Sequence, residues 1–149
     1  MALQEKLLTE MKNAMKSKDA VRLESLRAIK AALLLAKTEK SAGSELSEEE
    51  EIKIVQRLVK QRKDSAAIYK EQGRADLAEP ELAQAKVIES FLPEQLSEAE
   101  IEAVVEKTIA SVNAEGMKDM GKVMGIVSKE LAGKADGKTI STIVKAKLQ

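Results

Sequence analysis

Two N-terminal capping boxes constrain the fold of this chain more than any other feature of its sequence. Ser47 is followed by Glu50, and Ser97 by Glu100, each three residues later and each before a run of periodic apolar residues. In such a box the serine hydroxyl and the glutamate carboxylate pair with backbone amides that the start of a helix leaves unsatisfied. The sequence therefore predicts helices that begin close to residues 48 and 98.

The apolar residues of the chain favour helices throughout. They make up 44% of the 149 residues and are mostly Ala, Leu, Ile, Val and Met, while Tyr69 and Phe91 are the only aromatic residues. Sheets prefer aromatic and β-branched side chains. We therefore expect an all-α fold, arranged as one ordinary domain or two small ones.

Apolar spacing predicts about four helices before residue 93. The second is rich in Ala and Leu on several sides and is expected at the centre of the bundle, with Asp19 as its cap and Ser41-Ala42-Gly43-Ser44 as its stop. Pro80 is tolerated only in or before a first turn, so the fourth helix could begin later than Ala75. The predicted ranges are 4–16, 20–40, 48 to a break near Gly73, and 75–92.

The segment Phe91-Leu92-Pro93-Glu94-Gln95-Leu96-Ser97 is the clearest boundary in the sequence, because Pro93 ends a helix and Ser97 starts another. We place a domain junction there. Residues 1–92 are expected to form the N-terminal helical bundle, and residues 93–149 a small C-terminal domain with three helices, over 98–112, 119–131 and 137–148.

The zero net charge hides an asymmetry in the C-terminal part. Residues 93–115 contain one Lys and six acidic residues, and residues 116–149 contain seven Lys and three acidic residues. The two stretches therefore carry net charges of −5 and +4. Adjacent acidic and basic surfaces favour an oriented approach to a polyanion.

The predicted helix over 118–131 separates two kinds of surface when its residues are projected at about 100° each. One side is apolar and should face the core. On the other side Gly121 and Gly125 lie beside Lys122 and Lys129. Each exposed glycine costs about 1 kcal/mol relative to Ala, so the pair indicates close approach by another backbone, either a phosphate–ribose chain or a neighbouring helix. Asp119 is expected to cap the helix.

The turn Gly133-Lys134-Ala135-Asp136-Gly137-Lys138-Thr139 resembles a phosphate loop only superficially. A Walker A loop has four residues between its first Gly and Gly-Lys-Thr, whereas three lie between Gly133 and Gly137. Asp136 is better interpreted as the cap of the last helix. Lys134 and Lys138 can still reach a phosphate from this turn.

The residue types that the chain lacks, and the positions of some that it has, argue against several kinds of functional site. The absence of His and Cys excludes His-based triads, thiolate chemistry and the usual zinc or haem ligands, and we expect no metal or cofactor. Glu48–Glu51 are interpreted as a solvated first turn. Arg62 falls within an apolar stripe, where it could form an ion pair between helices, extend its charged end to solvent, or bind an anionic ligand.

The sequence also predicts no membrane association. No apolar run approaches the roughly 20 residues that cross a bilayer, and Met1 to Asn13 alternates charge with Leu where a signal peptide would be continuously apolar. We expect a cytoplasmic protein. Two scattered aromatic residues cannot form a base-stacking platform, so any RNA contact would be through backbone and shape.

Four motifs together resemble the GatB/YqeY family, and they occur in order over essentially the whole chain. They are Lys60-Gln61-Arg62-Lys63-Asp64-Ser65, Phe91-Leu92-Pro93-Glu94-Gln95-Leu96, Asp119-Met120-Gly121-Lys122-Val123-Met124-Gly125 and Gly133-Lys134-Ala135-Asp136-Gly137. The resemblance implies an N-terminal helical bundle followed by a three-helix tail. It also implies kinship with the tail of the B subunit of tRNA amidotransferase, which engages tRNA.

Three functions follow as hypotheses from this resemblance. The first is a non-catalytic tRNA-binding module, with no DNA as partner; its contacts would be Lys118, Gly121, Lys122, Gly125, Lys129, Lys134 and Lys138. The second is an adaptor for an amidotransferase or aminoacyl-tRNA synthetase subunit. The third is direct participation in transamidation, since the family is associated with carbon–nitrogen ligase activity that uses glutamine as amido donor. We expect no activity from this chain alone.

Overall fold

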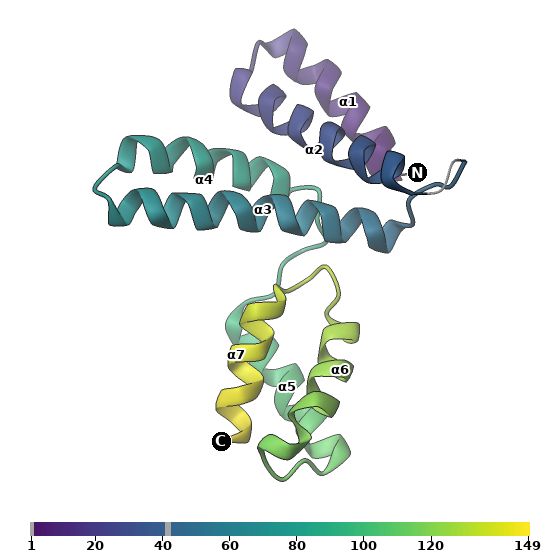
Figure 1. Ribbon diagram of the computed structural model, residues 1–149, viewed down its shortest axis with the longest axis vertical. Coiled ribbons are helices and arrows are strands. Elements are labelled where there is room, and N and C mark those ends of the chain that lie inside the picture. The colour runs from purple at the N-terminus through teal and green to yellow at the C-terminus, as the bar shows by residue number, and fades with distance from the viewer. Residues whose placement is uncertain (1, 41–42) are drawn as a thin grey trace. The chain divides into compact units, whose positions relative to one another are not determined.

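The computed structural model describes residues 2–40 and 43–149, and within them the chain is helical with no strand. The predicted all-α class is confirmed. The chain divides into two compact units, residues 1–92 and 93–149 (Figure 1). Of the predicted stop after the second helix, residues 41 and 42 lie outside the described ranges, while Gly43 and Ser44 are not helical.

The first unit consists of two helical hairpins. In each, a short turn joins helices that run side by side in opposite directions (Figure 1). Their bounds are α1 Ala2–Ser17, α2 Ala20–Glu39, α3 Glu48–Glu71 and α4 Ala75–Glu89.

The predicted starts of α2 and α3 are confirmed by their caps. The Asp19 carboxylate accepts a hydrogen bond from the Arg22 amide at 3.1 Å. At α3, the Ser47 hydroxyl accepts from the Glu50 amide at 3.1 Å, and the Glu50 carboxylate accepts from the Ser47 amide at 2.7 Å. Both capping patterns read from sequence therefore correspond to real hydrogen bonds.

The alternative of a later start for α4 is wrong. This helix begins at Ala75 and contains Pro80 as its sixth residue. Proline has no amide hydrogen, so the carbonyl of Asp76 loses its usual helical donor. The helix tolerates this loss because Asp76 is exposed to water. The helix also ends at Glu89, three residues earlier than predicted, in a turn where the Leu92 amide donates to the Glu89 carbonyl.

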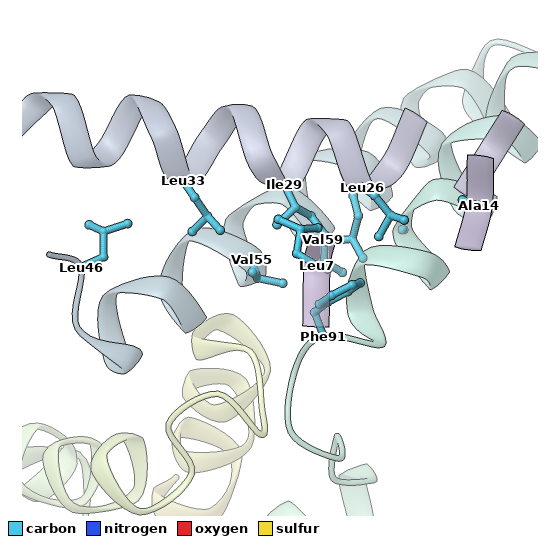
Figure 2. Close-up of a cluster of buried hydrophobic side chains, with 11 residues drawn as sticks. Leu7, Ala14, Leu26, Ile29, Leu33, Leu46, Val55, Val59 and Phe91 are labelled. Carbon is cyan, nitrogen blue, oxygen red and sulfur yellow. The ribbon is translucent and has the colours of Figure 1, made fainter. Parts of the chain in front are cut away.

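A core of aliphatic side chains and Phe91 fills the first unit (Figure 2). Leu26, Ile29 and Leu33 contribute one face of α2, and Val55 and Val59 contribute a face of α3. As expected, α2 lies centrally in the unit, because it packs against α1, α3 and α4. Leu34 and Leu35, near its C-terminal end, are nevertheless 60% and 61% exposed.

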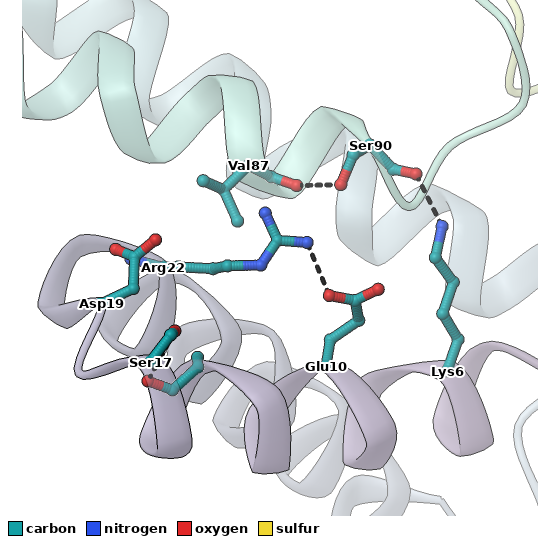
Figure 3. A network of polar contacts seen from close by, with 8 residues as sticks. Lys6, Glu10, Ser17, Asp19, Arg22, Val87 and Ser90 are labelled. Carbon is teal, nitrogen blue, oxygen red and sulfur yellow. Dashed lines mark hydrogen bonds and ion pairs between the residues drawn. The ribbon is translucent and has the colours of Figure 1, made fainter.

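Polar contacts attach α1 to the rest of this unit (Figure 3). Arg22 and Glu10 form an ion pair at 2.6 Å between α2 and α1. The Lys6 ammonium donates to the carbonyl of Ser90 at 3.0 Å and lies 4.8 Å from the centre of the Phe91 ring. The segment after α4 is thereby fastened to the first helix.

The interpretation of Glu48–Glu51 as a solvated turn is wrong at one residue. Glu48 and Glu49 are exposed, but Glu51 is only 2% exposed. Its carboxylate accepts a hydrogen bond from the side chain of Gln4 at 3.2 Å. Successive helix residues point in different directions, so the fourth glutamate of the run turns towards α1.

The second unit packs three helices around its own core. They are α5 Glu98–Val112, α6 Met120–Glu130 and α7 Gly137–Leu148, with a single 3₁₀ turn, η1 Met117–Asp119, before α6. The predicted capping box at Ser97 and Glu100 is present. Buried aliphatic residues of all three helices meet in the core, among them Val105, Val123 and Val144. The sequence predicted these helices, apart from the 3₁₀ geometry that replaces the first turn of α6.

Candidate nucleic-acid interface

The amphipathic pattern of α6 places one side of the helix in the core of the second unit and the other in solvent. Val123 and Val127 are fully buried, and Leu131, just after the helix, is nearly so. Gly121, Lys122, Gly125 and Lys129 are all exposed. The helix period therefore brings two glycines and two lysines together on the free side of α6.

The two glycines of this face are open. A Cβ atom built on Gly121 or Gly125 would meet no atom within 4 Å, among the residues that the structure describes and outside the helix's own backbone. Within the second unit, the alternative that the glycines let a neighbouring helix pack closely is therefore wrong. The backbone of α6 is accessible to another molecule along this strip. We call Gly121, Lys122, Gly125 and Lys129 the glycine–lysine face.

Four of the five predicted lysines have no carboxylate within ion-pair distance in the described part of the chain: Lys122, Lys129, Lys134 and Lys138, all of them exposed. Lys118 differs, because its ammonium pairs with Glu115 at 3.2 Å. Both partners of that pair are well solvated, so it is weak. Four lysines thus present uncompensated positive charge.

Asp119 does not cap α6, contrary to the prediction. Its carboxylate instead accepts a hydrogen bond from the backbone amide of Glu115 at 2.9 Å, and it makes no capping bond to the helix. The 3₁₀ turn at Met117–Asp119 explains the difference, because it replaces the extended conformation that a capping aspartate normally adopts.

Asp136 does cap α7, as predicted. Its carboxylate accepts from the Lys138 amide at 3.2 Å and from the Thr139 hydroxyl at 3.0 Å. The negative charge occupies the amides at the start of α7, which are the groups that would otherwise bind an anion. The side chains of Lys134 and Lys138, on either side of Asp136, are therefore the available anion contacts of this turn.

The turn before α7 is held by two hydrogen bonds. The sequence gives no reason to expect either of them. The Gln95 side-chain amide donates to the carbonyl of Gly133 at 2.7 Å, and the Leu96 amide donates to the carbonyl of Lys134 at 2.9 Å. From sequence, Pro93–Leu96 is recognisable only as a boundary. The partner of Gln95 lies 38 residues away, and local pattern carries no signal for such a pair.

Arg62 belongs to the first unit and is not part of this surface. Its guanidinium donates to the side-chain carbonyl of Gln84 on α4 at 3.1 Å and to the backbone carbonyl of Leu58 at 3.3 Å. No carboxylate lies within ion-pair distance of Arg62 in the described ranges, so its inter-helix partner is an amide and, of the three alternatives, the ion pair is wrong. Its role as an anion site stays a prediction.

In the described part of the chain, no group of three or more acidic side chains is placed to hold a metal ion. None of the described helices combines the length and the apolar character needed to cross a lipid bilayer.

Comparison with known proteins gives a match over nearly the whole chain. Residues 4–148 match the family model described as Yqey-like protein. A relative named "Altered inheritance of mitochondria protein 41, mitochondrial", from Pyrenophora tritici-repentis, is 30% identical over 132 residues, which are 87% of this chain and 71% of that protein.

A second group of relatives is much longer than this chain. The E subunit of glutamyl-tRNA(Gln) amidotransferase from Thermococcus gammatolerans is 40% identical over 74 residues, covering 47% of this chain and 12% of that protein. Its counterpart from Methanococcus maripaludis (strain C6) is 41% identical over 69 residues, covering 46% of this chain and 11% of that protein. The chain therefore spans only about a tenth of these amidotransferase subunits.

Proposed function

Because this chain belongs to the family of Yqey-like proteins, we propose that it is a non-catalytic tRNA-binding module. The observation that carries the proposal is the open glycine–lysine face of α6, where two residues without side chains lie beside two lysines that have no ion-pair partner among the described residues. A phosphate–ribose backbone can approach such a strip closely while ammonium groups neutralise its phosphates.

The side chains available define how this surface would recognise RNA. Residues 93–149 contain seven lysines in their basic stretch but no arginine and no aromatic residue. Stacking on bases and bidentate contacts to guanine by arginine therefore have no side chains to provide them. Recognition through phosphates and overall shape is what remains, and its affinity should depend strongly on salt.

The relatives supply the class of RNA. The name of the amidotransferase relatives specifies a tRNA as the molecule on which that enzyme acts, and we propose tRNA as the ligand of this chain. We propose no catalysis by the chain alone, since amide transfer from glutamine needs an activated nucleophile and a phosphate-binding cradle. Purified protein given glutamine, ATP and mischarged tRNA should release no glutamate.

A titration of purified tRNA at several salt concentrations tests the proposal. We expect binding at low salt, with log K falling by about 0.7–0.9 per log unit of salt for each phosphate neutralised. The Lys122→Glu/Lys134→Glu variant should lose most of this binding. The matched control Lys12→Glu/Lys107→Glu changes the same charge at exposed lysines outside the site and should bind normally. Equal binding by the two double variants would contradict the proposal.

A second candidate is an adaptor for the amidotransferase or for an aminoacyl-tRNA synthetase, and the acidic surface of α5 favours it. Glu98 and Glu102 are exposed there without an ion-pair partner in the described ranges. Binding to a purified amidotransferase complex, measured after nuclease treatment, tests this function. Glu98→Lys/Glu102→Lys should abolish such binding while leaving tRNA affinity intact.

For the compartment we propose the cytoplasm. The relatives named as mitochondrial proteins make the mitochondrion the alternative. Fractionation of source cells, followed by detection of the protein in each fraction, distinguishes the two.

A further inference from the structure

The side chain of Gln95 links two backbone segments that are far apart in the sequence. Its amide nitrogen lies 2.8 Å from the carbonyl oxygen of Pro93 and 2.7 Å from that of Gly133. Beside it, the Leu96 amide donates to the carbonyl of Lys134 at 2.9 Å. Residues 93–96 are therefore bonded directly to the turn that precedes α7.

The turn has further support from within. The Lys134 amide donates to the carbonyl of Leu131 at 2.9 Å, so the backbone of Lys134 is hydrogen-bonded through both its amide and its carbonyl. Ala135 is buried in the core of the second unit. Lys134, in contrast, is exposed. An exposed ammonium group is thus attached to a backbone position that is hydrogen-bonded on both sides.

We propose that Gln95 is a positioning residue for the cationic turn of Gly133–Lys138. The inference rests on the proposed function, and it adds a residue that supports the RNA contact without making it. A backbone already ordered in the free protein loses less conformational entropy when Lys134 and Lys138 bind phosphates. Removing the amide of Gln95 leaves the carbonyl of Gly133 without this partner and loosens the turn.

Because of where Gln95 lies in the chain, the proposal also implies a way in which RNA affinity is regulated. Pro93–Leu96 is the stretch through which the chain passes from the first compact unit to the second. A partner that displaced this stretch would break the bonds to Gly133 and Lys134 together. RNA affinity would then fall although no lysine had changed.

The test uses the full chain and the variant Gln95→Leu, which keeps the size of the side chain and removes its donor. Gln61→Leu is the matched control, since Gln61 is an exposed glutamine on α3. In the free protein, amide hydrogen exchange should accelerate at Lys134 and Ala135 and stay unchanged at Val105 and Val123. Affinity for tRNA should fall about three- to tenfold in Gln95→Leu and remain normal in the control.

A double-mutant cycle separates positioning from a general structural role. If Gln95 acts through the turn, Gln95→Leu should have little further effect on tRNA affinity in a Lys134→Ala/Lys138→Ala background. An equal loss in both backgrounds would overturn the inference. Should Gln95→Leu fail to fold, Gln95→Asn keeps the amide with a shorter reach and should give a smaller change in the same direction.

The remaining outcomes distinguish this inference from the proposed function. Normal tRNA affinity in Gln95→Leu, with tRNA bound by the unmodified chain, overturns the positioning role and leaves the tRNA-binding proposal intact. No binding of tRNA by the unmodified chain at low salt overturns both. Unchanged hydrogen exchange at Lys134 and Ala135 overturns the positioning role whatever the affinity.

Discussion

The side-chain amide of Gln4 donates a hydrogen bond at 3.2 Å to the carboxylate of Glu51, a residue 47 positions later that is only 2% exposed. The bond joins α1 to the first turn of α3. A buried carboxylate is costly unless it is hydrogen-bonded, so the stability of the first unit depends on an amide near the start of the chain.

Replacement of Gln4 by Ala should therefore destabilise the protein. The variant leaves the Glu51 carboxylate buried without its donor, which costs about 1–3 kcal/mol. Urea unfolding followed by circular dichroism measures this loss as a lower midpoint. Gln61→Ala, at an exposed position of α3, should change the unfolding free energy by less than about 0.5 kcal/mol. Equal effects of the two variants would contradict a specific role for the Gln4–Glu51 bond.

The glycines of α6 should show opposite effects on stability and binding. Gly125→Ala should stabilise the protein by about 0.5–1 kcal/mol, because a helix prefers Ala and the added methyl group meets no neighbour. The same methyl group should weaken tRNA binding by holding the RNA backbone away. Thermal unfolding and tRNA titration measure the two effects. Ser111→Ala on the exposed surface of α5 serves as control, and undiminished tRNA affinity in Gly125→Ala would count against backbone approach.

For single lysine substitutions, the salt dependence of RNA binding reports a lost phosphate contact more specifically than the affinity at one salt concentration does. Lys129→Ala removes one uncompensated charge from the glycine–lysine face, so the slope of log K against log salt should become shallower by about 0.7–0.9. Lys107→Ala, on α5, should leave the slope unchanged. The idea would fail if both variants gave the slope of the unmodified chain.

The Glu50 carboxylate should make stability depend on pH in the acid range. Its hydrogen bond from the Lys40 ammonium lowers its pKa below the ordinary value of 4.5, assisted by the bond from the Ser47 amide. A depressed folded-state pKa gives stability that is complete above the unfolded pKa and is lost as the pH falls through the folded value. Glu50→Gln should therefore lose stability at about pH 6 relative to the unmodified chain, and the difference should shrink towards about pH 3. A difference between Glu50→Gln and the unmodified chain that does not change with pH would contradict this role of Glu50.

The parts of the fold that could be predicted are those that neighbouring residues encode. The boxes at Ser47 and Ser97, the aspartate caps at residues 19 and 136, and the apolar stripe of α6 all depend on contacts within one or two turns. Periodicity alone also indicated that Gly121 and Gly125 lie away from the core. Whether anything covers them required the packed structure.

Except at Asp119, the features that the sequence did not predict depend on residues far away along the chain. The burial of Glu51 requires Gln4, and the exposure of Leu34 and Leu35 follows from which side of α2 its neighbours cover. Gln95 needs the carbonyl of a residue 38 positions later. At Asp119, the chain forms a 3₁₀ turn instead of the extended conformation in which aspartate caps a helix. Composition and period do not specify such partners.

Gly133 is buried, with a φ of 79° in the left-handed region that L-amino acids with side chains disfavour by roughly 1–2 kcal/mol. The conformation of this turn thus depends on glycine, which has no side chain, at position 133. A methyl group added at Gly133 would therefore disturb two things together. It would change the direction in which the side chain of Lys134 points, and it would shift the carbonyl of Gly133 that accepts the hydrogen bond from Gln95.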